Sequence, residues 1–163
     1  MRKIILSGIL VGIVALTGCM QDMQSLEKGN PSARHKVLVA GASSEFKNQV
    51  ITKVLEALQK EDCYIKIISP DQLAAEKTTG FNAILLITPM MAGQLDGRIV
   101  KFIAGDPANP RVIVFCTSGD ENHPPTDRIR SAIGKADAVT SASIASRTDE
   151  RVREITDLIK KRW

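Results

Sequence analysis

Aromatic side chains are scarce in this sequence, since its 163 residues include four Phe, one Tyr and one Trp. A site that holds a flat ring between two aromatic side chains would have few residues to draw on. No charge dominates either, because 22 Lys and Arg stand against 18 Asp and Glu, and two of the basic residues, Arg2 and Lys3, open the chain. The basic stripe of a nucleic-acid-binding protein is therefore not indicated, and nucleic acid is not an expected partner.

The sequence also lacks an apolar run of the ~20 residues that a membrane-spanning helix requires. An apolar stretch of 13 residues, from Ile4 to Leu16, follows the basic pair Arg2 and Lys3. A positive start, a short apolar middle and an exit of small residues form the pattern of a secretory signal peptide. We therefore expect residues 1–18 to be a signal peptide.

The exit of that peptide, Leu16-Thr17-Gly18-Cys19, resembles the lipobox of bacterial lipoproteins. The resemblance implies cleavage before Cys19, a diacylglyceryl group on its sulfur and a further acyl chain, such as palmitate, on its new amine. Two or more acyl chains give a stable membrane anchor. The expected location is the non-cytoplasmic side of the cell membrane, or the outer membrane where a cell has one. Met20, in place of Asp after the lipidated Cys, resembles the outer-membrane sorting pattern.

Residues 19–34 are expected to form the lipidated Cys and a flexible tether, because they lack periodicity and contain Gly29, Asn30 and Pro31. A coil of this length would reach roughly 20 Å. The folded domain is then expected over residues 35–163.

Short apolar runs of strand type alternate with helical stretches from Lys36 onward. The strand-type runs cover 36–40, 64–69, 83–88, 111–116 and 138–144, and helical spacing follows each of them. Ser69 with Pro70 and Gln72 marks the start of a short helix, and Thr126 and Thr148 mark two later starts. This alternation predicts an α/β fold, a doubly wound parallel sheet of five strands covered on both faces in three α/β/α layers.

Sheets of this kind bind ligands at the carboxyl ends of their strands, which directs attention to the loops over 41–48, 88–96 and 117–125. In these regions the chain resembles the flavodoxin-like family, nearest to the short branch that includes quinone-dependent protoporphyrinogen oxidases. The resemblance is carried by Val37-Leu-Val-Ala-Gly-Ala-Ser43, by Phe81-Asn-Ala-Ile-Leu-Leu-Ile-Thr-Pro-Met-Met-Ala-Gly93 and by Cys116-Thr-Ser-Gly-Asp120. It implies the strand order 2-1-3-4-5 and riboflavin 5′-phosphate (FMN) over the first and third strands.

The implied strand order also separates the two cysteines that remain once Cys19 is lipidated. Cys63 on the edge strand and Cys116 on the fourth strand would lie three strand spacings, or ~14 Å, apart, beyond the ~7 Å limit for a disulfide. Two unpaired thiols are expected. Cys116 ends a strand at the ligand edge, where it is either a reactive thiol or, as is more common for a free Cys, a packing residue.

The resemblance places the FMN phosphate at the first loop, on Ser43, Ser44 and Asn48. The family continues there with a Gly and further hydroxyl residues, whereas this chain has Phe46, Lys47 and Asn48, with Glu45 adding negative charge that Lys47 could offset. The phosphate cradle is therefore degraded, and Ser43 or Ser44 serves equally as an ordinary helix N-cap.

The other two loops would hold the flavin ring. The resemblance implies that Thr88, Met91 and Gly93 lie beside the ring, with Met91 at the position where the family usually has an aromatic residue. Alternatively, Met90 and Met91 simply fill a gap under the next helix. Ser118, Gly119 and Asp120 resemble the loop at the pyrimidine edge of the ring. His123 either covers the ring or is an exposed turn residue. With only two His in the chain and no repeated ligand spacing, no metal site is expected at Asp120, Glu121 and His123.

Other chemistries lack their sequence signatures, because the chain has no G-x-S-x-G, G-x-x-x-x-G-K-[ST] or G-x-G-x-x-G motif. Two functions stay open. The first is FMN-dependent electron transfer by a lipid-anchored flavodoxin-like protein. The second is a flavodoxin-like scaffold without flavin and without catalytic residues, which binds or assembles with another envelope protein. A chain exported unfolded would have to acquire flavin outside the cytoplasm, and this favours the second.

Overall fold

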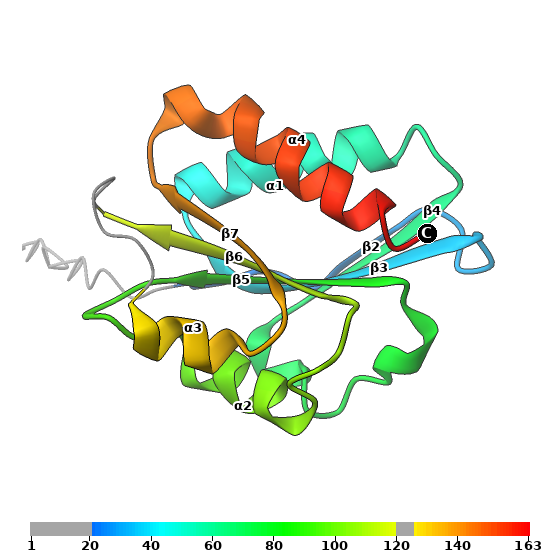
Figure 1. Cartoon of the computed structure of the whole chain (residues 1–163). Helices are drawn as coiled ribbons and strands as arrows, with labels where there is room; N and C mark the ends of the chain where they lie inside the picture. Colours follow the sequence, from blue (N-terminus) through cyan, green and yellow to red (C-terminus); the bar gives the residue numbers. More distant parts are fainter. Residues whose placement is uncertain (1–20, 120–125) are drawn as a thin grey trace, which may run out of the picture.

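The computed structural model describes residues 21–119 and 126–163. A twisted sheet lies between two pairs of helices, with α1 and α4 on one face and α2 and α3 on the other (Figure 1). The expected signal peptide, Cys19, Asp120, Glu121 and His123 lie outside the described residues. Within the described part, no helix is both long and apolar enough to cross a bilayer.

The strands are β1 (Gln21–Asp22), β2 (Leu26–Lys28), β3 (His35–Ser43), β4 (Cys63–Ile68), β5 (Ala83–Pro89), β6 (Val112–Ser118) and β7 (Asp137–Ala142). The helices are α1 (Glu45–Leu58), α2 (Gly97–Gly105), α3 (Asp127–Ile133) and α4 (Thr148–Lys160). Single 3-10 turns are η1 (Pro70–Gln72), η2 (Thr78–Gly80) and η3 (Ala145–Arg147).

Five parallel strands in the order β4-β3-β5-β6-β7 form the body of the sheet. This is the order 2-1-3-4-5 of the sequence analysis, so the predicted doubly wound α/β architecture is confirmed. The central strand β5 is apolar along most of its length, and Ala83 to Thr88 are all buried. A strand buried on both faces needs this composition, because helices cover it on each side.

Two hydrophobic clusters fill the space between the sheet and its two helix layers. Phe46 of α1 meets Phe115 of β6 in the first, with ring centroids 6.3 Å apart. Ile99 and Ile103 of α2 and Ile129 of α3 belong to the second cluster. Successive side chains of a strand point to opposite faces, so β3, β4, β5 and β6 each contribute to both clusters.

The helices begin where the sequence indicates them. Ser44 caps α1 and accepts the Lys47 N–H at 3.4 Å, and Thr126 caps α3 in the same way. The short helix expected after Ser69 is the single 3-10 turn η1, where the backbone N–H of Ser69 donates to Gln72 Oε1 at 2.9 Å. No long helix covers the crossover from β4 to β5, since η1 and η2 are its only helical turns.

The N-terminal segment corrects the sequence analysis, which expects a flexible tether over 19–34. From Gln21 onward that expectation is wrong, because β1 pairs antiparallel with the end of β3 and β2 pairs antiparallel with the outer edge of β4. Met23 between them is 8% exposed and its N–H donates to Gly41 O at 2.9 Å. Strands of two and three residues are too short to show an alternating pattern, so periodicity could not reveal them.

The two remaining cysteines are free and buried, which confirms the expected unpaired thiols. Burial raises the pKa of Cys63 to about 11 and that of Cys116 to about 12. The reactive species is the thiolate, so both residues should be inert in the folded protein near neutral pH. Cys116, only 2% exposed, is thus placed as a packing residue.

We therefore expect residues 20–163, which lack Cys19, to show almost no reaction with a thiol-specific disulfide reagent at pH 8. Both thiols should react at once after unfolding in guanidinium chloride. The reaction is followed by absorbance and by the mass of the intact protein. Rapid labelling of one thiol in the native protein, with its fold unchanged, would contradict the burial of that residue.

Candidate functional site

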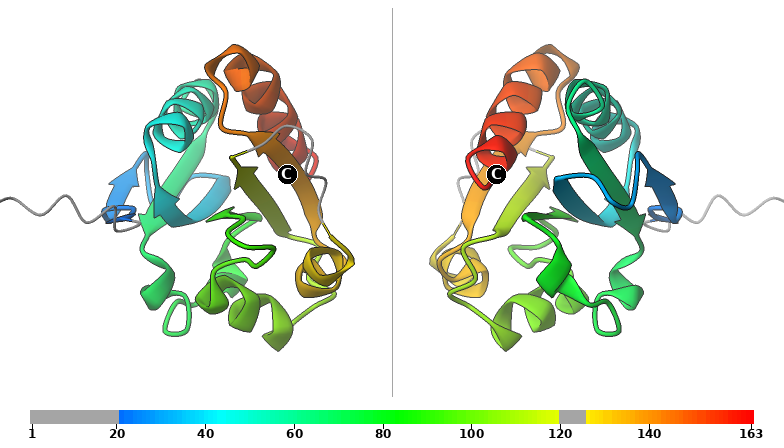
Figure 2. Two further views of the ribbon diagram at one scale, coloured as in Figure 1. Left: turned by 90° about the vertical axis from the view of Figure 1, so that its left-hand side faces the viewer. Right: turned by 90° about the vertical axis from the view of Figure 1, so that its right-hand side faces the viewer.

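The loops that the sequence analysis selects lie together at the carboxyl edge of the parallel strands. In Figure 1 this edge is on the left, where the arrows of β5, β6 and β7 point, and the left view of Figure 2 looks directly onto it. The first loop joins β3 to α1, the second joins β5 to α2 and the third follows β6. The sheet therefore does bring the candidate residues of all three loops to one edge.

In the first loop the predicted phosphate ligands already have partners within the chain. Ser43 Oγ donates to Asn48 Oδ1 at 3.0 Å, and Ser44 Oγ caps α1 by accepting the Lys47 N–H. The backbone of Ser43 lies opposite Gln21 in the β1–β3 pair. A phosphate would need free hydroxyl and N–H groups at this point. Here the Ser43 hydroxyl and the Lys47 N–H already donate to groups within the chain.

Lys47, in the first turn of α1, turns toward the interior and is only 3% exposed. Burial lowers the pKa of its amine, because the charged form loses hydration. The sequence analysis considered Lys47 as a charge that offsets Glu45, but Glu45 is exposed and no ion pair joins the two within the described residues. Lys47 is therefore a buried residue of α1 that makes no direct ion pair with Glu45 within the described residues.

Gly41, near the end of β3, lies opposite Ile87 of β5. A Cβ atom on Gly41 would stand 2.3 Å from the carbonyl oxygen of Ile87 and 2.5 Å from the Ile87 Cβ. Real Cβ atoms do not come so close to backbone oxygens. The glycine is thus required by the spacing of two central strands, independently of any ligand.

The second loop contains a tight hairpin turn. Met91 and Gln94 exchange two backbone hydrogen bonds of 2.9 Å, and the two residues between them, Ala92 and Gly93, have φ values of +48° and +71°. Positive φ at both central positions is the pattern of a type I′ turn. Met91 is 62% exposed at the base of this turn, so it does not pack under the next helix.

Thr88 and Met90 hold this turn against the sheet. The Thr88 hydroxyl is buried, accepts the N–H of Asp96 at 3.1 Å and donates to the carbonyl of Pro89. The N–H of Met90 donates to Thr117 O at 2.7 Å, and the Met90 side chain packs on the second core cluster. The Thr88 hydroxyl therefore has a partner within the chain both as a donor and as an acceptor.

The third loop leaves β6 through Ser118 and Gly119. The carbonyl of Ser118 accepts the N–H of Ser143 at 3.0 Å, and Gly119 is exposed with no atom close to where a Cβ would lie. Asp120, expected at the edge of the ring, and His123, for which a ring contact and an exposed turn were both open, lie outside the described residues. Ser118 and Gly119 thus do lie at the predicted edge.

A cluster of charged residues that the sequence analysis did not predict lies at the carboxyl edge of the sheet, on the side of β4. Arg98, in the first turn of α2, holds both carboxylate oxygens of Asp22 at 2.7 and 2.9 Å. It also binds Asp96 at 2.6 Å and Asp71 at 3.1 Å. Three carboxylates surround one guanidinium, so the cluster carries excess negative charge that disfavours an anion nearby. Hydrogen bonds from Arg98 lower the pKa of Asp96, and these carboxylates raise the pKa of Arg98.

Two of the cavities in the described residues reach this edge. One of about 430 Å³ is lined by the N-terminal segment, Ser43, Asn48 and residues of α1. Another of about 590 Å³ separates the turns η1 and η2 from α2. Thr88, Met91 and Gly119 line neither of them. Within the part of the chain that the structure describes, no three His, Cys, Asp or Glu side chains gather as a metal site would require.

Comparison with known proteins gives structural neighbours of the chain. No family model matches the chain, and no curated protein matches it. A flavodoxin from the domain Archaea superposes with a TM-score of 0.56 at 14% identity, covering 78% of this chain and 98% of its own. A flavodiiron core from Synechocystis sp. gives 0.56 at 12% identity, covering 81% of this chain and 36% of that one.

An oxidoreductase from Corynebacterium diphtheriae gives a TM-score of 0.54 at 16% identity, covering 79% of this chain and 97% of its own. A flavodoxin from Bacillus cereus gives 0.51 at 15% identity, covering 78% and 99%. Likeness at such low identity is a statement about architecture. The protein therefore has a flavodoxin-like fold.

Proposed function

We propose that this protein is a membrane-anchored envelope lipoprotein whose flavodoxin-like domain binds, or assembles with, another envelope protein. Cys19 carries the lipid, and the domain works without a flavin and without a catalytic residue. The lipobox Leu16-Thr17-Gly18-Cys19 supports the anchor. The geometry of the β3 end supports the absence of flavin.

The observation that carries this proposal is that other residues of the chain already contact the polar groups at the end of β3. Ser43 bonds to Asn48, Ser44 caps α1, and β1 occupies the free side of Ala42 and Ser43. The excess negative charge around Arg98 stands on the same edge. A dianionic phosphate would have to displace these contacts and meet carboxylates, so the residues present do not fit FMN.

The alternative function is FMN-dependent electron transfer, which the flavodoxin-like fold alone favours. Ser43, Ser44 and Asn48 would then hold the phosphate. Thr88, Met91 and Gly93 would lie beside the ring and Ser118, Gly119 and Asp120 at its edge. Met91 can pack on a ring but stacks less specifically than an aromatic residue.

A titration of FMN into residues 20–163, followed by flavin fluorescence, separates the two functions. We expect no quenching up to about 1 mM, where the binding free energy is only ~4 kcal/mol. The double variant Ser43→Ala/Ser44→Ala is the matched control, since it removes both loop hydroxyls. Quenching at micromolar FMN that the double variant loses would establish a flavin site and overturn the proposal.

The anchor is tested separately by expressing the full chain in bacteria and separating membranes from soluble protein. The wild-type chain should sediment with membranes and incorporate labelled palmitate, whereas Cys19→Ala should do neither. Cys63→Ala is the control, because it removes a thiol that is buried in the folded domain. Equal labelling of wild type and Cys19→Ala would exclude lipidation at this residue.

A further inference from the structure

Large hydrophobic side chains that remain exposed in the described residues all lie toward the carboxyl edge of the sheet. They are Leu26, Met91 and Ile144, which are 43%, 62% and 37% exposed. Met91 follows β5, Ile144 follows β7, and Leu26 pairs with Ile67, one residue before the end of β4. Single exposed hydrophobic residues are normal on a protein surface, but these three share one edge of the molecule.

The chain enters the fold at the same edge. Only Met20 separates Cys19 from Gln21, the first residue of β1. Two residue steps of fully extended chain span at most about 7 Å. Because β1 pairs with Ala42 and Ser43 at the very end of β3, a lipid on Cys19 would lie close beside the carboxyl edge.

The entry segment is held firmly at that point. Both carboxylate oxygens of Asp22 bind Arg98, at 2.7 and 2.9 Å, and the Met23 side chain is buried in the first core cluster. A tether of 14 or more residues would let the domain turn freely above a membrane, whereas this segment provides almost no slack. The anchor therefore restrains the orientation of the domain as well as its location.

We propose that the carboxyl edge of the sheet lies against the lipid surface, with Leu26, Met91 and Ile144 touching the boundary between headgroups and acyl chains. This inference rests on the proposed lipidation of Cys19. Once the anchor holds the domain at the bilayer, further contacts form within one complex, so even a small apolar area suffices to fix the orientation. The partner protein of the proposed function then meets the opposite edge or the helix layers.

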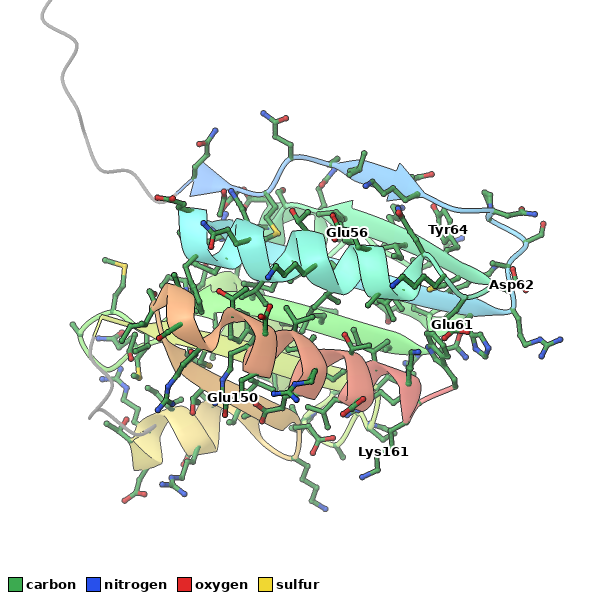
Figure 3. All side chains as sticks on the ribbon, turned by 90° about the horizontal axis from the view of Figure 1, so that it is seen from above. Glu56, Glu61, Asp62, Tyr64, Glu150 and Lys161 are labelled. Carbon is green, nitrogen blue, oxygen red and sulfur yellow. The ribbon has the colours of Figure 1, made fainter. Side chains whose placement is uncertain are left out.

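The opposite edge of the sheet provides the control positions for a test. Asp62 and Lys161 lie there, at the end of the molecule away from the start of α1 (Figure 3), and both are exposed. Trp163, the single Trp of the chain, stacks at this edge on His35, the first residue of β3, with ring centroids 4.2 Å apart. Its emission therefore reports on the edge that should face away from the lipid.

The test uses tryptophan quenching by brominated phosphatidylcholine in vesicles. The processed chain, residues 19–163, is attached through the Cys19 thiol to a maleimide lipid, because Cys63 and Cys116 are buried. Single-Trp variants are made in a Trp163→Phe background: Met91→Trp and Ile144→Trp on the carboxyl edge, and Lys161→Trp on the opposite edge. The chemical coupling makes this result independent of whether the cell lipidates Cys19.

Met91→Trp and Ile144→Trp should lose most of their emission in brominated vesicles compared with ordinary ones, and their spectra should shift to the blue. Lys161→Trp and the native Trp163 should change little. The Lys161→Trp chain controls for the affinity of any exposed Trp for membranes. Equal quenching at both edges, or stronger quenching at Lys161→Trp, would overturn the proposed orientation, and thermal melts show that each variant is folded.

Discussion

Gly41→Ala should lower the free energy of unfolding by about 3 kcal/mol or more, which is the upper range for overpacking a core. The added Cβ would stand 2.3 Å from the carbonyl oxygen of Ile87, in the strand that pairs with β3. Neither strand can move away easily, because β3 and β5 are each hydrogen-bonded on both sides and covered by helices. Strain at this point therefore spreads into the centre of the sheet.

Equilibrium unfolding in urea of residues 20–163 measures this effect. Gly105→Ala is the matched control, since Gly105 is the last residue of α2 and no atom lies within 4 Å of its added Cβ. That control should be neutral or stabilise by up to ~1 kcal/mol. A loss below about 1 kcal/mol for Gly41→Ala would show that β3 and β5 can separate at a low cost, against the close approach described.

Arg98→Met should cost about 2 kcal/mol at pH 7. The variant leaves Asp96, with a side chain 6% exposed, as a buried carboxylate without a counter-ion, and such losses reach 3–5 kcal/mol at fully buried pairs. The Arg98 side chain is itself 34% exposed, so solvent screening reduces the expected value. The variant also frees Asp22 and with it the N-terminal segment.

The same variant should lose its effect in acid. Arg98 lowers the pKa of Asp96 from its ordinary value of 3.8. A carboxyl group whose pKa is depressed by folding stabilises the folded state above its ordinary pKa, and this stabilisation disappears as the pH falls through the folded pKa. The difference between wild type and Arg98→Met should thus be full at pH 6–8 and shrink below pH ~4.

Urea unfolding at several pH values, with limited proteolysis of the segment before β3, measures both consequences. Arg128→Met is a suitable control, because Arg128 is an exposed residue of α3. It should change stability by less than about 0.5 kcal/mol at every pH. A constant difference between wild type and Arg98→Met from pH 7 to pH 3 would show that the carboxylates around Arg98 do not contribute as described.

The sequence predicts the body of this fold because its signals are local. Ser44 and Thr126 are recognisable caps, and uniformly apolar runs such as 83–88 identify strands buried on both faces. Contacts between residues that are far apart in the sequence leave no such local pattern. Arg98 meets Asp22 across 76 positions of sequence, and β2 is only three residues long, so neither the cluster nor the covered edge of β4 could be foreseen.

At the candidate site the sequence predicts location better than role. Ser43, Thr88, Met91 and Gly119 do stand at one edge, as parallel topology requires. The groups that these residues contact depend on the tertiary structure, as the pairing of β1 with Ser43 shows. The hairpin turn after Met91 carries a misleading signal, because Ala92 adopts the positive φ at which Asn or Gly is usual.

The antiparallel direction of β1 also decides how mechanical load would pass through the molecule. Tension on Cys19 pulls β1 along its own length, past the end of β3, so its backbone bonds are sheared together and not opened one after another. The bidentate Asp22–Arg98 contact shares this load with α2. A lipid anchor attached to Cys19, as proposed, would transmit force into β3 through this pairing.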